Sequence, residues 1–435
     1  MPMANNIIAD GDHVIFKRDG TCRVFQIKPD RQAYFEKVKF TVNDLIGQQF
    51  GSTFKVDRGN LVKLSETKVL ELEQVASEPG ADNRNLLDSE SNQKMRLEDI
   101  QKMKSDGLSG EKIIEELVEN SETFDSKTSF SQAKYLKKKK KKHLQMFTVL
   151  RPTARLVMEI FSKEPAKICF LRPDTVSQIL NFSNVMYGSN VAVVETCQGL
   201  VLACVLERLG GHGKVIHIVP NTSDTLCRQV MNYFNLTKDQ LDHFYSVPIT
   251  CLKVETDGTQ HKSLNINSST EIPGDTLVSY SRTELPAIEM LPDRTDDVNE
   301  AEKSDIMTEE KEAEKKKREV KREEKQKRQE AAAALIQNKK LDSLIIACKY
   351  NPLPVVKKLI QFLPPSRCVV VYCQYIEPLV ECYTWIKEQQ VGCQLKFSET
   401  WCRDYQVLPN QTHPVINMSG TGGYLLTYTT VSKLS

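Results

Sequence analysis

The residues from Val191 to Pro220 have the spacing of a nucleotide-cofactor site. They read VAVVETCQGLVLACVLERLGGHGKVIHIVP, in which an apolar run ends at the acid Glu195 and a turn with one glycine leads into an apolar helix. A second apolar run, Val215–Val219, follows a Gly-His-Gly turn. A strand, a loop, a helix and a strand in this order can hold a nucleotide at the helix N-terminus. The pattern therefore indicates the binding of a nucleotide-like cofactor as the chemistry to test.

The loop lacks most of the glycines that such a site needs. In S-adenosylmethionine-dependent methyltransferases the first loop reads acid-x-G-x-G-x-G, and the matching positions here are Glu195, Cys197, Gly199 and Val201. The side chains of Cys197 and Val201 stand where the cofactor or the backbone must come close. The second strand ends at Val219-Pro220, which offers neither an acid for the ribose nor a backbone N–H at the proline. We therefore expect no cofactor in this chain; an active methyltransferase with an atypical loop is the alternative.

Length and composition allow two or three domains with real cores. The chain has 435 residues, of which 40% are hydrophobic and 27% charged, and the charges cancel to a net +2. This balance points to no partner by itself. The twelve cysteines form no C-x-x-C pair, which predicts reduced, mostly buried thiols. The start of the chain is polar and no apolar run approaches about 20 residues, so we expect neither a signal peptide nor a membrane span.

The pattern along the chain predicts an α/β protein in three parts. Residues 1–70 contain short alternating runs between turn signals, which predicts a small N-terminal β-barrel. Residues 71–145 read as a polar linker and a basic helical segment. Residues 146–435 alternate strands and helices, which predicts a mostly parallel sheet with a low-complexity charged insertion at 254–335. The expected strands lie at 191–194, 215–219, 249–253, 368–373 and 394–398, with a hairpin over 415–431.

Longer motifs carry a resemblance to a known family. They are DNRNLLD (82–88), the run DGLSGEKIIEELVENSETFDSKTSFSQAKYLKKKKKK (106–142), ETCQGLVL (195–202), SRCVVVYCQYIEPLVECY (366–383), SETWCRDYQVLP (398–409) and MSGTGGYLL (418–426). With these motifs the chain closely resembles the non-catalytic, RNA-binding subunits of the eukaryotic tRNA adenine-N1 methyltransferases, which modify adenine 58 in the T-loop. The resemblance covers nearly the whole chain apart from the insertion. It implies that 146–435 is a Rossmann-like, methyltransferase-type domain with a degenerate cofactor loop.

The resemblance also implies a role without catalysis. Such a subunit looks like a duplicate of the catalytic subunit that has lost its cofactor contacts and its catalytic acid; the stretch Cys368–Ile376, matched to the acid-bearing strand end, contains no Asp or Glu. Family members assemble with the catalytic subunit as a heterotetramer, two of each, and tRNA lies across both types. We therefore expect a nuclear, tRNA-binding subunit whose partner binds S-adenosylmethionine, and no membrane contact. A structural scaffold that barely touches RNA is a further alternative.

A run of lysines is the clearest candidate for RNA contact. Six consecutive lysines repel one another, and phosphates would offset this repulsion. The predicted contacts are Lys134, Lys137, Lys138, Lys139, Lys140, Lys141 and Lys142, with Tyr135 and His143 as stacking neighbours. Such contacts supply affinity rather than base specificity. A solvated helix or a nuclear-import signal is the alternative.

Four further groups suit contact with RNA because amides, guanidinium groups and aromatic rings bind phosphates, 2′-hydroxyls and unpaired bases. They are the linker residues Asn83, Arg84 and Asn85; the loop lip Glu195, Thr196 and Cys197; the loop residues Thr400, Trp401, Arg403 and Tyr405; and the turn Ser419, Gly420, Thr421, Gly422 and Gly423, with Arg367 as a weaker phosphate candidate. The alternatives are an Asx-turn for the linker, a packed remnant for the lip, a core position for Trp401, and an ordinary hairpin or subunit-interface turn for the glycines.

Overall fold

The computed structural model describes residues 6–66 except 19, 37 and 58, residues 93–252 except 107, 109 and 221–227, and residues 319–432 except 321, 408–411, 417 and 419. The chain divides into two compact units, Met1–Lys163 with Asn232–Asn235, and Glu164–Met231 with Leu236–Ser435. The division falls after the boundary expected at 146, because Met146–Leu150 is the middle strand of the first unit's sheet. The predicted linker at 71–92 and most of the insertion, 253–318, lie outside the described residues.

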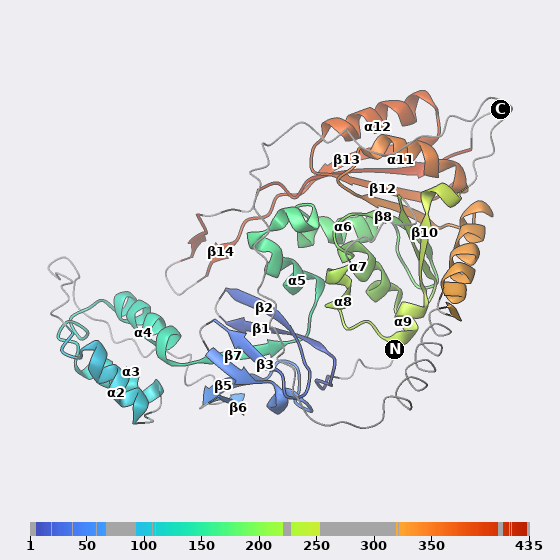
Figure 1. Cartoon of the computed structure of the whole chain (residues 1–435). Helices are drawn as coiled ribbons and strands as arrows, with labels where there is room; N and C mark the ends of the chain where they lie inside the picture. The colour runs from blue at the N-terminus through green and yellow to red at the C-terminus, as the bar shows by residue number, and fades with distance from the viewer. Residues whose placement is uncertain are drawn as a thin grey trace, which may run out of the picture. The chain divides into compact units, whose positions relative to one another are not determined.

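The first unit is built on antiparallel strands (blue in Figure 1). Its five-stranded sheet has the order β2-β1-β7-β5-β6, and β3 and β4 form a separate hairpin. The strands are β1 (His13–Arg18), β2 (Thr21–Gln26), β3 (Gln32–Phe35), β4 (Val38–Thr41), β5 (Thr53–Asp57), β6 (Asn60–Lys63) and β7 (Met146–Leu150). Sheet and hairpin share one core, in which the rings of Phe16 and Phe147 lie 4.6 Å apart and those of Phe40 and Phe147 lie 5.2 Å apart. The alternating apolar residues of 13–63 are therefore directed into this core.

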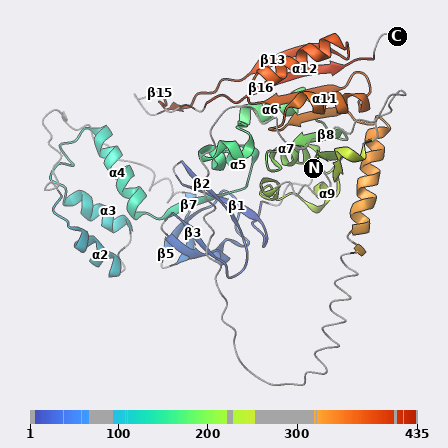
Figure 2. The ribbon, with the colours of Figure 1, turned by 45° about the horizontal axis from the view of Figure 1, so that its top comes forward.

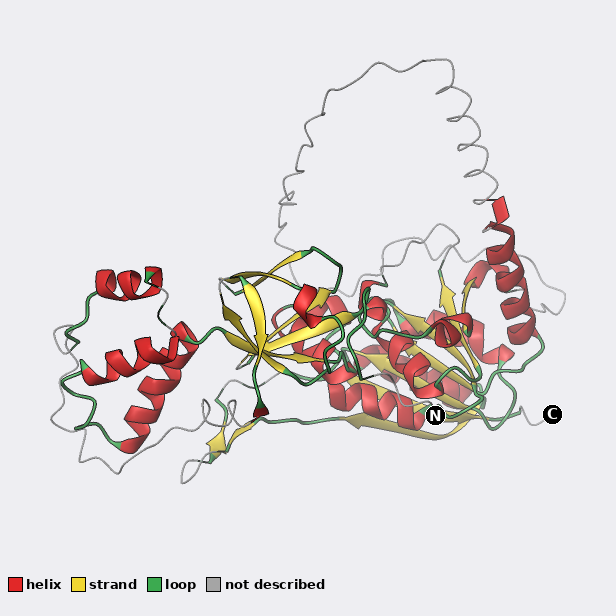
Figure 3. Ribbon diagram, turned by 90° about the horizontal axis from the view of Figure 1, so that it is seen from below, coloured by secondary structure: helices red, strands yellow, loops and turns green. Residues whose placement is uncertain are grey.

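Helices complete the first unit. Between β6 and β7 come α2 (Leu97–Ser105), α3 (Gly110–Glu119) and α4 (Ser129–His143), which gather beside the strands in Figure 3, and α5 (Ala154–Ile160) follows β7. Gly110 lets α3 approach the end of α4, since a Cβ there would overlap the carbonyl oxygen of His143. Thr128 caps α4 by accepting a hydrogen bond from the Ser131 N–H.

The second unit contains a seven-stranded sheet of the order β10-β9-β8-β11-β12-β16-β13. The strands are β8 (Asn190–Glu195), β9 (Lys214–Val219), β10 (Phe244–Pro248), β11 (Ser343–Ala347), β12 (Cys368–Cys373), β13 (Gly392–Glu399) and β16 (Tyr424–Thr430). Neighbours from β10 to β12 pair in parallel, and β16 pairs antiparallel with both β12 and β13. The chain reverses its direction of travel across the sheet after β10, which places a switch point between β8 and β11.

Helices cover both faces of this sheet. They are α6 (Pro173–Phe182), α7 (Leu200–Leu209), α8 (Gln229–Asn232), α9 (Lys238–Asp242), α11 (Pro352–Leu359) and α12 (Glu377–Glu388). Val194, Ile346 and Val371 pack with α11 and α12 in one core, and Figure 2 shows α6 and α7 on the other side of the strands. The α/β class and the methyltransferase-type arrangement expected from the sequence are present. No helix of the described residues is long and apolar enough to cross a membrane.

Three expectations were wrong in detail. The strand expected at 249–253 lies at Phe244–Pro248, and Ile249–Cys251 forms a 3-10 turn instead. Among the described residues of 415–431, where a hairpin was expected, only Tyr424–Thr430 forms a strand, and it enters the sheet between β12 and β13. The charged insertion expected at 254–335 is not separate from the sheet domain throughout, because the helix over 322–337 buries Ala332 and Ile336 fully in the core of that domain.

Candidate nucleic-acid interface

The loop after β8 is closed by contacts within the protein. The Glu195 side chain is 3% exposed, and its Oε2 accepts a hydrogen bond of 2.9 Å from the Val201 N–H in the first turn of α7. Burial raises the pKa of Glu195 to about 8, although the hydrogen bond from Val201 opposes the shift. The acid of the degenerate loop therefore caps α7 and does not face a ligand.

The two glycine positions that follow serve packing. The Cys197 thiol is fully buried and donates to the Ala347 carbonyl at 3.2 Å. Gly199 has a φ of 85°, and a Cβ there would lie 2.9 Å from the Cβ of Met231 on α8. A sulfur thus occupies the position of the first glycine, and the surviving glycine makes room for α8. These residues do not fit a methyl-donor site.

The expectation that the lip faces RNA needs correction. Glu195 and Cys197 are buried, so neither presents a surface to RNA, and the packed remnant is the alternative that the geometry favours. Thr196 is partly exposed, but its Oγ1 accepts the Lys349 N–H at 3.0 Å. The fourth strand of this sheet in chain order is β11 rather than β12, and the residues after it, Cys348, Lys349 and Tyr350, include no acid.

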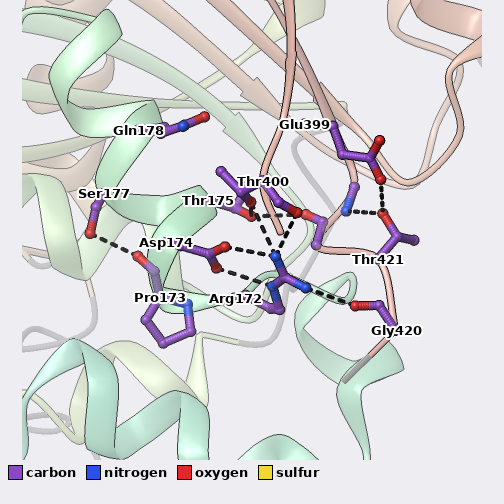
Figure 4. Close-up of polar contacts among 12 residues, drawn as sticks. Arg172, Pro173, Asp174, Thr175, Ser177, Gln178, Glu399, Thr400, Gly420 and Thr421 are labelled. Carbon is purple, nitrogen blue, oxygen red and sulfur yellow. Dashed lines mark hydrogen bonds and ion pairs between the residues drawn. The ribbon is translucent and has the colours of Figure 1, made fainter. Parts of the chain in front are cut away.

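Arg172, which the sequence did not single out, organises the loop after β13 (Figure 4). Its Nε and Nη2 bind the two carboxylate oxygens of Asp174 at 3.1 and 2.7 Å. The same guanidinium donates to the carbonyl of Thr400 at 2.7 Å and to that of Gly420 at 2.8 Å. One side chain at the start of α6 therefore joins two segments that are more than 200 positions away in the sequence.

The turn at 420–423 packs tightly on this arginine. A Cβ at Gly422 would lie 2.8 Å from the Arg172 Nε, and a Cβ at Gly423, whose φ is 75°, would overlap the Tyr372 ring. Gly422 and Gly423 are buried, so they shape the turn rather than touch RNA. Gly420 and Thr421 are exposed, and Thr421 donates to Glu399 at 3.3 Å. Ser419 lies outside the described residues.

The loop held by Arg172 presents two aromatic side chains to solvent. Trp401 is 72% exposed and Tyr405 is 55% exposed, whereas Arg403 is partly buried. The exposure of Trp401 excludes the alternative that it is a core residue. Arg367 does not join this group. It precedes the start of β12, whereas the loop follows the end of β13, and its guanidinium lies 3.9 Å from the Asp342 carboxylate.

The helix α4 sorts its lysines into two sets. Lys134, Lys137, Lys138, Lys141 and Lys142 are exposed, and their spacing of i, i+3, i+4, i+7 and i+8 puts them on one face, called here the lysine stripe. Lys139 and Lys140 are partly buried on the other side. Burial, with help from Lys142 and Lys138, lowers the pKa of Lys139. A row of point charges along one helix face suits a row of phosphates.

Two predicted stacking residues are used inside the protein. Tyr135 donates to the Leu117 carbonyl of α3 at 3.2 Å, and the ammonium groups of Lys127 and Lys139 lie 5.4 and 5.1 Å from its ring centre. His143 is buried at the end of α4. The buried His143 ring cannot stack on a base, so that prediction is corrected, whereas Tyr135 is only partly buried and its stacking on RNA stays a prediction. Asn83, Arg84 and Asn85 lie outside the described residues.

Arg18 of β1 is a second side chain that the sequence did not reveal. Its guanidinium donates to the carbonyls of Lys141 and Leu144, the latter at 2.7 Å, and forms an ion pair with Glu36 at 3.1 Å. It thereby satisfies carbonyl groups that the last turn of α4 leaves without helical partners. Alternation in β1 gives no hint of this contact, because its partner lies in another element.

Comparisons with known proteins agree on one family. A family model described as the Gcd10p family matches residues 7–329. A Mus musculus protein named tRNA (adenine(58)-N(1))-methyltransferase non-catalytic subunit TRM6 is 38% identical, and the alignment covers 99% of this chain and 90% of that protein. A Dictyostelium discoideum protein of the same name is 31% identical, with 99% and 80% covered. The solved structure of an S-adenosylmethionine-dependent O-methyltransferase from Thermotoga maritima has a TM-score of 0.51 at 10% identity, covering 99% of this chain and 97% of that one, which shows a shared fold.

Proposed function

The chain belongs to the Gcd10p family, and from this premise we propose that it is the non-catalytic, tRNA-binding subunit of a tRNA (adenine-58-N1)-methyltransferase. The observation that carries the proposal is the closed loop after β8. Its acid caps α7 and its first glycine position holds a buried thiol, so the methyltransferase-type fold lacks the contacts that a methyl donor needs. The bound S-adenosylmethionine then belongs to the catalytic partner.

Two surfaces support the RNA-binding part of the proposal. The lysine stripe offers charge for the phosphate backbone, and the loop from Thr400 to Tyr405 offers exposed rings for unpaired nucleotides. The lysines supply salt-dependent affinity, while stacking adds contacts that every base can make. Together they position a tRNA without reading an extended sequence.

An exposed arm supports assembly with the catalytic partner. The strands β14 (Tyr405–Gln406) and β15 (His413–Pro414) pair with each other after β13. Val407 is 74% exposed and Ile416 is 88% exposed on this arm, and a protein partner would remove these apolar side chains from water. We propose that the assembly contains two copies of each subunit and works in the nucleus.

Reconstitution tests the function. The full chain and the catalytic subunit are purified separately and together, and methyl transfer to tRNA and binding of S-adenosylmethionine by calorimetry are measured. We expect neither binding nor transfer by this chain alone and full transfer by the mixture. Micromolar binding by the lone chain, or transfer that Glu195→Ala abolishes, would instead establish an active methyltransferase with an atypical loop.

Nuclear location is tested with a fluorescent fusion of the full chain. The proposal expects nuclear fluorescence. A cytoplasmic fusion contradicts it. If the lysine stripe also acts in import, a fusion with these lysines changed to glutamine stays in the cytoplasm.

A further inference from the structure

Four cysteines collect where the central strands of the second unit end. Cys197 follows β8, Cys348 follows β11, Cys373 ends β12, and Cys169 lies in the loop before α6. Their thiols influence one another's ionisation. Among the described residues no group of His, Cys, Asp or Glu is placed to hold a metal ion. The four cysteines are therefore free thiols; Cys169 is partly exposed, and the other three are buried.

Cys169 and Cys197 each influence the ionisation of the other thiol. The Cys197 thiol donates to the Ala347 carbonyl at 3.2 Å. The Cys169 sulfur also lies 3.4 Å from the Thr196 Oγ1. Because that oxygen already accepts the Lys349 N–H at 3.0 Å, its own proton is directed to the sulfur. Thr196, the residue before Cys197, thus donates a hydrogen bond to the Cys169 sulfur.

The backbone holds Cys169 in place. Cys169 and Phe170 have φ values of 53° and 58°, in the left-handed region that side chains rarely adopt. The Tyr372 hydroxyl donates to the Cys169 carbonyl at 2.6 Å, and Tyr372 is itself buried. These features hold the backbone of Cys169 next to Tyr372 of β12.

The two thiols differ in acidity. The neighbouring Cys197, supported by Thr196 and Lys349 and opposed by burial, lowers the pKa of Cys169 below the usual thiol value. Burial raises the pKa of Cys197. The titratable or charged groups that face Cys169 are Cys197, Glu195, Cys348, Lys349, Tyr372 and Cys373. A partly exposed thiolate beside a protonated thiol is the arrangement of an oxidisable cysteine and its resolving partner.

We propose that Cys169 and Cys197 form a redox site that hydrogen peroxide converts to a disulfide. The Cys169 thiolate attacks one peroxide oxygen, the O–O bond breaks, and the products are Cys169 sulfenic acid and hydroxide. The Cys197 thiol then attacks the sulfenic sulfur, an S–S bond forms, and the hydroxyl leaves with the thiol proton as water. Each disulfide consumes one peroxide and the two electrons of the two thiols, and a dithiol reductant reverses the step.

Peptide mass spectrometry of the full chain tests the proposal. The reduced protein is treated with hydrogen peroxide under native conditions, alkylated and digested. We expect a Cys169–Cys197 cross-linked peptide, which a reductant removes. In Cys197→Ala the sulfenic acid has no partner, so dimedone should label Cys169. Cys393→Ser, which removes an exposed thiol on β13, is the control and should leave the cross-link unchanged.

Because Cys197 is buried, the Cys197→Ala variant could misfold. A second test therefore uses proteins that keep both cysteines. In the natural chain we expect the rate of alkylation of Cys169 by iodoacetamide to reach half its maximum at a lower pH than that of an ordinary exposed cysteine. Thr196→Val removes one donor and should move this midpoint to higher pH. If exposed Cys251, Cys393 and Cys402 are oxidised while Cys169 stays reduced, or if the midpoint does not move, the redox site is refuted.

Discussion

At the scale of single residues, Glu195 is a buried acid whose raised pKa makes the stability of the protein depend on pH. In the folded protein its pKa is about 8 because of burial, against a usual value of 4.5. Between these values the folded state keeps a proton that the unfolded state releases. Stability therefore falls by about 1.4 kcal/mol for each pH unit across this window. The carboxyl group thus weakens the fold at neutral pH while its oxygen caps α7.

Glu195→Gln tests this account, because glutamine has the shape of the protonated acid and its oxygen can still accept the Val201 N–H. We expect the free energy of unfolding at pH 7 to rise by roughly 3 kcal/mol and the fall between about pH 4.5 and 8 to disappear. Urea unfolding is followed by tryptophan fluorescence, since Trp385 and Trp401 both lie in the second unit. Glu207→Gln, at an exposed site of α7, is the control. If the free energy of unfolding changes with pH in the same way in the natural chain and in Glu195→Gln, the account is contradicted.

Arg172 is the second residue whose environment makes a prediction. Burial alone would raise the pKa of Asp174, but hydrogen bonds from Arg172 and Thr400 outweigh it and leave the pKa lowered. A lowered carboxyl pKa gives stability above its unfolded value that is lost as the pH falls through the folded value. The ion pair should therefore hold the 400–405 loop at neutral pH and release it in acid.

Arg172→Ala should lower the free energy of unfolding of the second unit by about 2 kcal/mol, the usual effect of losing hydrogen bonds to a charged group. Amide hydrogen exchange should speed up in 399–406 and 420–424, which the guanidinium joins. Arg208→Ala removes an exposed arginine with one side-chain bond to Asn181, so it is the matched control. Unchanged exchange in both segments would mean that the loop does not depend on Arg172.

At the scale of elements, the helix α4 exposes some of its consecutive lysines on one face and partly buries the others. Six lysines in a row predict charge, but the helix period decides which of them meet solvent. The exposed set, with Lys134, forms the lysine stripe, while Lys139 and Lys140 turn toward the protein. The cations of the last turn also interact favourably with the helix dipole.

Glutamine at all five positions of the lysine stripe should weaken tRNA binding and make the slope of log K against log salt shallower by about 3 to 5. Binding is measured by filter retention at several salt concentrations. The matched control changes five exposed lysines of the second unit to glutamine, namely Lys238, Lys339, Lys340, Lys387 and Lys396. Equal effects in both variants would show a general charge effect, and unchanged binding would favour a structural scaffold.

Sequence patterns located elements well where an apolar run ends at turn residues. The strand at Cys368–Cys373 has the predicted bounds, and the apolar helix expected after the one-glycine turn is present at Leu200–Leu209. The strand at Phe244–Pro248 was missed because its residues are only partly buried at the start and give no apolar run. The bond of Tyr135 to α3 and the burial of His143 could not be predicted, because both depend on how the helices pack in the folded protein. The Arg172 cluster was missed because each bond depends on pairing between distant segments.

At the scale of the whole molecule, the prediction concerns assembly. We expect the complex with the catalytic subunit to have the mass of two copies of each chain, which light scattering measures. Val407→Asp with Ile416→Asp places charges on the exposed arm and should lower this mass if the arm is a subunit interface. Exposed Val62, on β6 of the first unit, gives the control Val62→Asp. A mass of one copy of each chain in the unaltered complex would contradict the tetramer.

The position of β16 has a consequence for how the protein is made. Its strand lies between β12 and β13, both of which are synthesised earlier, and it pairs with each of them. During translation β13 therefore has no neighbour until the ribosome has passed Thr430, and its edge stays open to wrong partners. A premature stop codon before Tyr424 would remove β16 and leave that edge unpaired. We expect such truncated chains to be recognised by chaperones and degraded, a fate set by strand order rather than by the number of residues lost.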